Sequence, residues 1–118
     1  DAIAVDHTPF TYEEKTVAFT EAPAGAIGLE LALPLLWQEL VETEQLSALT
    51  LWSALSLHPA RCLNQSPPVI APDQPSEMIL FHPTQAWTVE SRSLKSRSAN
   101  TPWLGKTVLG RVVQVWRK

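Results

Sequence analysis

The sequence predicts an α/β fold in which the chain supplies one strand–helix unit of a larger parallel sheet, followed by further strands. Three observations predict it. Residues 2–5 form an uninterrupted apolar run, Ala-Ile-Ala-Val, which is typical of a strand buried in the centre of a parallel sheet. Leucines recur at three- and four-residue steps over residues 29–40, which indicates a helix. Residues 106–118 are rich in β-branched side chains and predict a strand.

The composition is that of a globular chain and argues against several function classes. The 118 residues fit a single domain, and 45% of them are hydrophobic and 18% charged. The net charge of -3 gives no electrostatic reason to expect nucleic acid as a partner. No apolar run approaches the roughly 18–20 residues that span a membrane. The single cysteine, Cys62, excludes an internal disulfide, fits the reducing cytoplasm, and is expected to be a small buried residue.

A long loop joins the first predicted strand to the helices. It runs from Asp6 to about Ala26, which is longer than most structureless loops, and it is therefore a candidate functional loop. The helix after it is expected to begin or kink at Pro34, because proline has no amide hydrogen and its ring clashes with the preceding turn. A second helix is expected over residues 47–57, with its first residue as N-cap, and one further helical turn over residues 58–64.

The composition changes after the helices. Residues 65–76 contain four prolines and are expected to be a connector without regular structure. Strand-like segments follow at residues 77–81 and 86–89, separated by a His-Pro pair, and Gly110 is expected to mark a bulge or bend in the last strand. A lone parallel strand leaves its backbone groups without partners, so we expect the chain to be part of a larger fold.

Asp6 and His7 form the most suggestive chemical motif, at the carboxyl end of the first predicted strand. In parallel α/β folds this end carries the loops that gather catalytic groups. A carboxylate there can bind a divalent metal or transfer a proton; the alternative is that Asp6 only caps the following turn. One aspartate is not a complete metal site, since zinc takes three or four protein ligands. His58 and His82 lack ligand spacing and are expected to be structural.

Two further motifs carry weaker signals. Gly25 and Gly28 precede a helix and could let backbone amides approach an anionic ligand, although a plain turn is the favoured interpretation. Residues 91–98 are basic and rich in serine, a composition that could bind phosphate or RNA. Because no aromatic residues are interleaved for base stacking, we expect a solvated loop there.

Four segments of the sequence together resemble dihydroorotases. They are "DAIAVDHTPFTYEEK", "EAPAGAIGLELALPLL", "HPARCLN" and "NTPWLGKTVLGRVVQVW", in this order and at this spacing. The similarity is to the C-terminal end of the bacterial class that is related to hydantoinases, within the amidohydrolase superfamily. Its most specific parts are Asp-His-x-Pro, the Gly-x-x-Gly-Leu-Glu helix start and the closing Gly-Arg-Val-Val strand. In detail, the sequence resembles that of cyanobacterial members.

The resemblance implies a parent fold in which a (β/α)8 barrel lies beside a small β-sandwich built from both chain ends. Residues 1–64 would hold barrel strand eight with its following loop and helices. Residues 65–76 would be the proline-rich connector, and residues 77–118 the C-terminal strands of the sandwich. The chain is then expected to be a fragment of a larger fold, with the rest of the barrel upstream of Asp1.

The resemblance also implies a reaction, the zinc-dependent reversible cyclisation of N-carbamoyl-aspartate to dihydroorotate in pyrimidine biosynthesis. One or two zinc ions polarise the amide and activate hydroxide in this family. By position, Asp6 matches the catalytic aspartate, which also binds metal, and Ala24 and Gly25 match the backbone pair that contacts the small-molecule substrate. Phe10 stands where the family has a substrate-binding histidine, and phenylalanine cannot donate a hydrogen bond to a carboxylate.

The chain alone is expected to be inactive and to bind no zinc tightly, because its sequence lacks the His-x-His-x-Arg motif, the carboxylated lysine and the further metal histidines. Phe10 motivates a second interpretation, a non-catalytic dihydroorotase-like scaffold for aspartate transcarbamoylase. A third is another cyclic amidohydrolase of hydantoinase type. Because the first strand would seek partners, we expect a homo-oligomer, a strand exchange or a companion chain.

Overall fold

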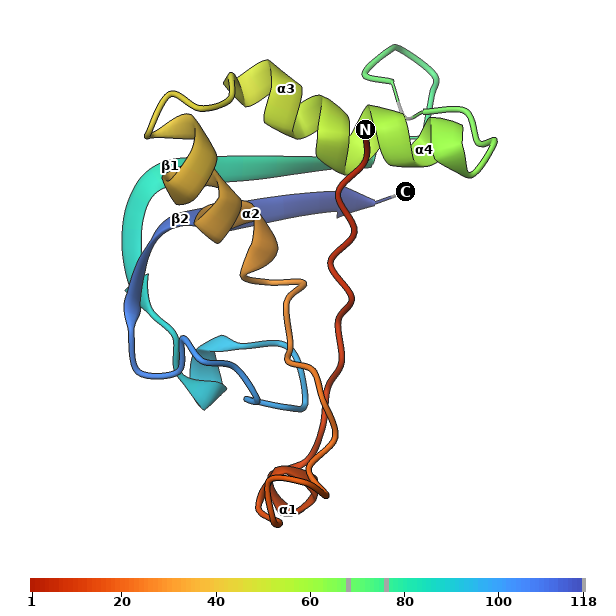
Figure 1. Cartoon of the computed structure of the whole chain (residues 1–118). Coiled ribbons are helices and arrows are strands. Elements are labelled where there is room, and N and C mark those ends of the chain that lie inside the picture. The colour runs from red at the N-terminus through yellow and green to blue at the C-terminus, as the bar shows by residue number, and fades with distance from the viewer. Residues whose placement is uncertain (68, 76, 118) are drawn as a thin grey trace.

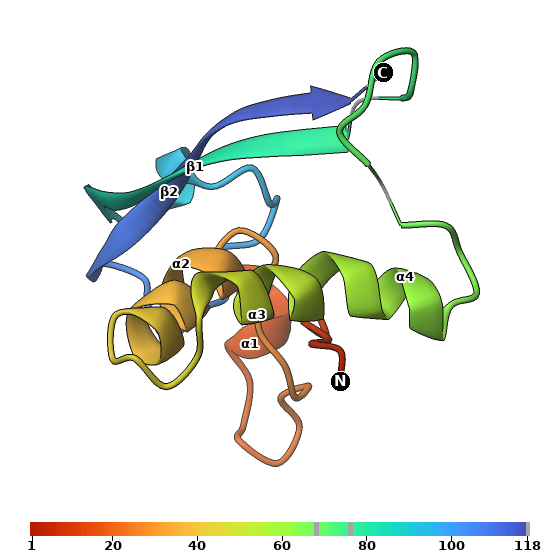
Figure 2. The same cartoon turned by 90° about the horizontal axis from the view of Figure 1, so that it is seen from above.

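The protein is described by a computed structural model that covers residues 1–67, 69–75 and 77–117. The helices come first along the chain and a two-stranded antiparallel sheet comes last. The helices form one layer, and the strands arch over them as a second layer (Figure 1 and Figure 2). At this level the α/β prediction is confirmed.

The opening segment differs from its prediction. Residues 2–5 form no strand in the part of the chain that is described. They run instead as an elongated trace past the helices, and the N–H of Ile3 donates to the carbonyl of Ala54 at 2.9 Å (Figure 1). A parallel strand needs neighbours on both sides, and the two described strands pair only with each other.

The long loop contains one helical turn, α1 (Tyr12–Lys15), that the expectation of a plain loop missed. The hydroxyl of Thr11 accepts a hydrogen bond from the N–H of Glu14 at 3.3 Å. The Glu14 carboxylate accepts one from the N–H of Thr11 at 2.7 Å. This reciprocal pair is a capping box, and its Thr-x-x-Glu spacing can be read in the sequence.

The first long helix begins as α2 (Ala32–Leu36) and continues as the π-helical turn η1 (Trp37–Val41). Pro34 lies in the first turn, where a missing amide hydrogen leaves no helical bond unmade. The expected helix start near Pro34 is therefore confirmed. At the other end, the N–H of Glu42 donates to the carbonyl of Trp37, five residues earlier, which defines the π turn.

The second helix is continuous through three segments, α3 (Ala48–Trp52), the π-helical η2 (Ser53–Leu57) and α4 (His58–Cys62). Ser47 is its N-cap, as expected, because its hydroxyl accepts from the N–H of Thr50 at 3.1 Å. The wider π turn comes just before Pro59, whose ring would clash with a carbonyl in a regular helix. The helical turn expected at residues 58–64 thus extends this helix.

The sheet is a hairpin of β1 (Glu77–Thr88) and β2 (Thr107–Arg117). β1 continues through the His-Pro pair where the sequence predicts a break. The register shifts between His82 and Ala86, opposite Gly110, which has a φ of +93°. A strand accepts proline at such an irregularity. The bend expected at Gly110 is confirmed, and the hairpin curves strongly (Figure 1).

The layers meet in a small core. It consists of five buried apolar residues: Ile27 from the long loop, Leu31 just before α2, Val89 and Leu94 from the connection between the strands, and Val108 from β2. Beside it, the ring of Phe81 lies 5.3 Å from Trp37 and 6.1 Å from Trp52, between centroids, and so ties the sheet to both helices. Cys62 is exposed, contrary to expectation, because α4 contributes no buried residue.

The connector agrees with its prediction where it is described. Residues 65–67 and 69–75 form no helix or strand. Residues 68 and 76, and residue 118 of the last predicted strand, lie outside the described residues. Within the described ranges, no helix is long and apolar enough to cross a membrane.

Candidate functional site

Asp6 is exposed where the opening segment turns into the long loop. Its φ is +48°, in the left-handed region, which aspartate and asparagine accept more readily than other non-glycine residues. The hydrogen bonds and the ion pair found among the described residues do not involve its carboxylate. A polar residue in such backbone geometry is a candidate functional residue, and here its oxygens are free for a ligand.

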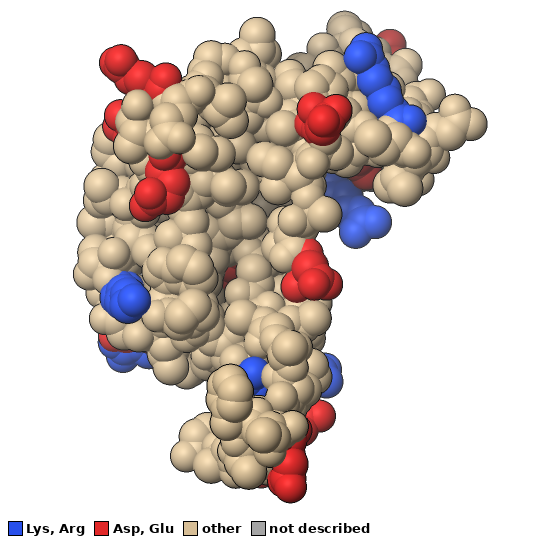
Figure 3. Space-filling view, viewed as in Figure 1, with Lys and Arg blue, Asp and Glu red and all other residues tan. Residues whose placement is uncertain are grey.

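A shallow groove of about 500 Å³ lies beside Asp6. It is lined by the opening segment, by residues 26–28 and by the first helix, and it includes a second carboxylate, that of Glu39. Charged side chains are dispersed over the face of the molecule in Figure 3, most of which is formed by uncharged residues. Most of the residues that line the groove are apolar, and Asp6 lies at the end of the opening segment.

His7 does not join Asp6 as a second chemical group. Its Nδ1 accepts hydrogen bonds from the backbone N–H of Gly28 at 3.1 Å and of Leu29 at 3.3 Å. Because Nδ1 is the acceptor in both, it carries no proton. His7 thus ties the start of the loop to the turn before α2, and the Asp-His motif divides into one free carboxylate and one structural histidine.

The backbone at Ala24 and Gly25 is exposed and is held against Thr8. The N–H and the hydroxyl of Thr8 both donate to the carbonyl of Ala26, at 3.0 and 3.1 Å. Gly25 has a φ of +121°, and a Cβ there would lie 2.0 Å from the Thr8 Oγ1, so this position requires glycine. No described residue accepts from the N–H of Ala24 or Gly25, so both can bind a ligand.

Lys15 connects Phe10 to the same segment. Its Nζ donates to the carbonyls of Pro23, at 2.7 Å, and Gly25, at 3.4 Å, and lies 5.6 Å from the centroid of the Phe10 ring. The ring therefore contacts a cation, and it has no hydrogen-bond donor of its own. Sequence reasoning missed Lys15, although the capping box would have placed it at the end of a helical turn.

The structure brings some of the predicted site residues together and leaves others apart. Asp6 shares the groove with residues 26–28, and Phe10 meets Gly25 through Lys15. His58 lies elsewhere, with its Nδ1 3.0 Å from the carbonyl oxygen of Asp1. Within the described ranges, no group of three or more His, Cys, Asp or Glu residues could hold a metal ion.

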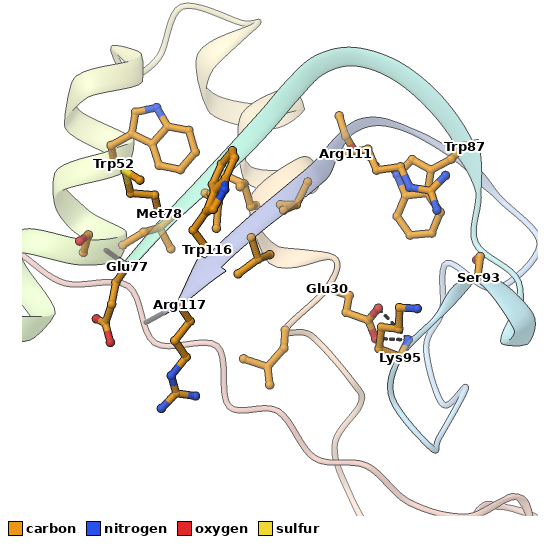
Figure 4. Close-up of a pocket in the computed structure, with 18 residues that line it drawn as sticks. Glu30, Trp52, Glu77, Met78, Trp87, Ser93, Lys95, Arg111, Trp116 and Arg117 are labelled. Carbon is orange, nitrogen blue, oxygen red and sulfur yellow. Dashed lines mark hydrogen bonds between the residues drawn. The ribbon is translucent and has the colours of Figure 1, made fainter. Parts of the chain in front are cut away.

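A second hollow, of about 800 Å³, lies between the hairpin and the helices (Figure 4). Its lining is largely apolar and includes Trp52 and Trp116. The Glu30 carboxylate beside it accepts from the backbone N–H of Lys95 and Ser96, all at 2.8 Å. This glutamate fastens the serine-rich loop to the turn before α2, and Glu77, at the start of β1, also lines the hollow.

Known proteins similar to this chain are dihydroorotases and dihydroorotase-like proteins, although no family model matches it. A protein of Synechocystis sp. named "Probable dihydroorotase-like protein" is 50% identical over 113 residues, which are 96% of this chain and 24% of that protein. The dihydroorotase of Clostridium acetobutylicum is 38% identical over 110 residues, 93% of this chain and 26% of that protein. That of Clostridioides difficile is 38% identical over 112 residues, 95% and 26% respectively.

The chain therefore spans about a quarter of the length of the curated relatives it matches. It belongs to the dihydroorotase family, as a C-terminal segment of such a protein.

Proposed function

We propose that the protein from which this segment comes is a dihydroorotase, which cyclises N-carbamoyl-aspartate reversibly to dihydroorotate in pyrimidine biosynthesis. The observation that supports this most is Asp6. Its carboxylate is exposed, has no hydrogen-bond donor among the described residues, and stands at a groove in backbone geometry that few residue types adopt. The names of the relatives add support for a hydrolase of the cyclic amidohydrolase type.

The chemistry proposed for this segment is proton transfer and orientation of the substrate. A carboxylate free of hydrogen bonds can accept a proton from attacking water and return it to the ring nitrogen when the amide opens. The free N–H groups of Ala24 and Gly25 would bind anionic or carbonyl oxygens of the substrate. Asp6 would therefore be the proton carrier, and the 24–25 backbone would orient the substrate.

Asp6 also fits one position in a zinc site. The carboxylates of Asp6 and Glu39 are the acidic groups that line the groove, whereas zinc in enzymes takes three protein ligands or more. The remaining ligands would come from the rest of the parent protein. When bound, zinc would polarise the substrate carbonyl and lower the pKa of a water molecule.

The test is Asp6→Asn in the full-length protein. Asparagine keeps the left-handed backbone of Asp6 but cannot carry the proton, so turnover of dihydroorotate should fall by about 100-fold or more while the melting temperature stays unchanged. Asp73→Asn is the matched control, because Asp73 is also exposed and has a φ of +60°. Equal activity of the Asp6 and Asp73 variants would contradict the role of Asp6. Turnover of hydantoins in place of dihydroorotate would favour the hydantoinase-type alternative.

A second candidate function is a non-catalytic, dihydroorotase-like scaffold for aspartate transcarbamoylase. Phe10 favours it, because its ring contacts the Lys15 ammonium and cannot donate to a substrate carboxylate. Phe10→His in the full-length protein separates the two functions. A gain of turnover would support a catalytic site at this position, whereas absence of turnover in both proteins, with retained binding of aspartate transcarbamoylase, would support the scaffold.

A further inference from the structure

The ammonium group of Lys15 is bound to backbone oxygens. It donates to the carbonyls of Pro23 and Gly25, and its side chain is half-buried although its neighbours along the loop are exposed. Within the described ranges the ion pair found is Arg92 with Glu90, so no carboxylate there neutralises Lys15. Hydrogen bonds from a charged donor are stronger than those from a neutral one, so Lys15 is a firm anchor for these carbonyls.

The two carbonyls belong to two peptide groups, Pro23–Ala24 and Gly25–Ala26, which are separated by one further peptide group. In a trans peptide the C=O and the N–H of the next residue point in opposite directions. Lys15 draws the carbonyl of Pro23 toward itself and thereby turns the N–H of Ala24 away from itself. It does the same to the N–H of Ala26 through the carbonyl of Gly25. Among the described residues neither N–H has an acceptor.

Other contacts hold the same segment from different sides. The side-chain amide of Asn100 donates to the carbonyl of Gly25 at 3.1 Å, and Thr8 holds the carbonyl of Ala26. Neither of them contacts the carbonyl of Pro23, which Lys15 alone holds among the described side chains. The direction of the Ala24 N–H therefore depends on Lys15.

We propose that Lys15 is a positioning residue that sets the direction of the Ala24 N–H for binding the substrate. Its role in catalysis rests on the proposed dihydroorotase function, whereas its hold on the loop does not. Lys15 acts through the backbone and would leave the proton transfer at Asp6 largely unchanged. Its loss should therefore weaken substrate binding more than it slows the chemical step.

The first measurement is steady-state kinetics of the full-length protein with dihydroorotate. Lys15→Met removes the ammonium and keeps the length of the side chain, so KM should rise about tenfold or more while kcat changes by less than about threefold. Lys15→Arg retains a charged donor and should restore most of the loss. Lys106→Met is the matched control, since Lys106 is exposed and lies outside this segment, and it should leave both constants unchanged.

The second measurement is independent of activity. The amide protons of Thr8 and Ile27 bond to the carbonyls of Ala26 and Asn100, so their hydrogen exchange reports how well the segment is held. Exchange should be faster in Lys15→Met than in the wild type and near normal in Lys15→Arg. Unchanged exchange would overturn the proposal. Faster exchange with an unchanged KM would also overturn it, because Lys15 would then be only structural.

Failure of the proposed function gives a different result. A full-length wild type without any turnover of dihydroorotate would contradict the dihydroorotase activity. The exchange measurement would still decide whether Lys15 holds the loop.

Discussion

Asp6 and Gly25 both adopt left-handed backbone conformations, with φ values of +48° and +121°. The sequence predicts Asp6 as a candidate because an apolar run precedes it, and it singles out Gly25 both as a glycine shortly before a helix and through a resemblance. None of these observations explains why an aspartate occupies position 6 and a glycine occupies position 25. Asp6 tolerates the turn at the groove, and Gly25 leaves room for Thr8.

Replacing Gly25 tests that second reason. Gly25→Ala would place a Cβ 2.0 Å from the Thr8 Oγ1 in addition to the cost of the positive φ. Overpacking of this kind costs about 1–3 kcal/mol of the free energy of unfolding, beyond a backbone cost of about 1–2 kcal/mol. Thermal or urea unfolding of the full-length protein measures it.

Gly105→Ala is the control for this prediction. Gly105 has a φ of +79°, but a Cβ there meets nothing within 4 Å, so only the backbone cost applies. If both variants lose the same stability, the close approach of Thr8 is not what requires glycine at position 25.

At the scale of the element, local sequence rules explain most of what was predicted. The N-cap at Ser47, the helix start around Pro34 and the bend at Gly110 follow from residue chemistry within a few positions. β1 shows the limit of such rules, because Pro83 does not end the strand. Pairing with β2 continues on both sides of an irregular stretch, and cross-strand hydrogen bonds override the local signal.

The capping box of α1 predicts a pH dependence. Hydrogen bonds from the backbone N–H and then the hydroxyl of Thr11 lower the pKa of Glu14 below its usual value of 4.5. The unfolded turn therefore binds the proton more readily than the folded one. The contribution to stability is present above about pH 4.5 and is lost as the pH falls through the lowered pKa.

Amide exchange of Thr11 and Glu14, measured between about pH 6 and about pH 3, checks this prediction, because this range includes the usual pKa of a carboxyl group. Protection of both amides should decline at the acidic end. Glu14→Gln keeps a side-chain acceptor but removes the titration, so its protection should not depend on pH over that range. If protection in the wild-type protein did not depend on pH, the capping box would not be a source of pH-dependent stability.

At the scale of the whole molecule, much apolar surface remains exposed on the hairpin. Val115 is 60% exposed and Trp116 is 42% exposed, while the buried cluster beneath contains only a few residues. The opening segment also pairs with no strand among the described residues. A chain that spans about a quarter of its relatives' length leaves surfaces that the rest of such a protein would cover.

The isolated 118-residue polypeptide is therefore expected to self-associate, to show no dihydroorotase turnover and to bind less than one equivalent of zinc. Sedimentation measures the first, a dihydroorotate assay the second, and metal analysis after gel filtration the third. A compact monomer would contradict the first expectation. Turnover or stoichiometric tight zinc in a pure sample would contradict the proposal that the rest of the site lies outside this segment.

The sequence by itself determined the two longer helices, the N-cap at Ser47, the last strand and the position of Asp6, because these depend on side chains that are neighbours along the chain. Its family also follows from the sequence. Only the tertiary structure decided that residues 2–5 pair with no described strand, that His7 binds the turn before α2, and that Lys15 reaches the carbonyl of Pro23. Each of these depends on contacts between residues distant in the sequence, and no local pattern specifies which backbone group a side chain will meet.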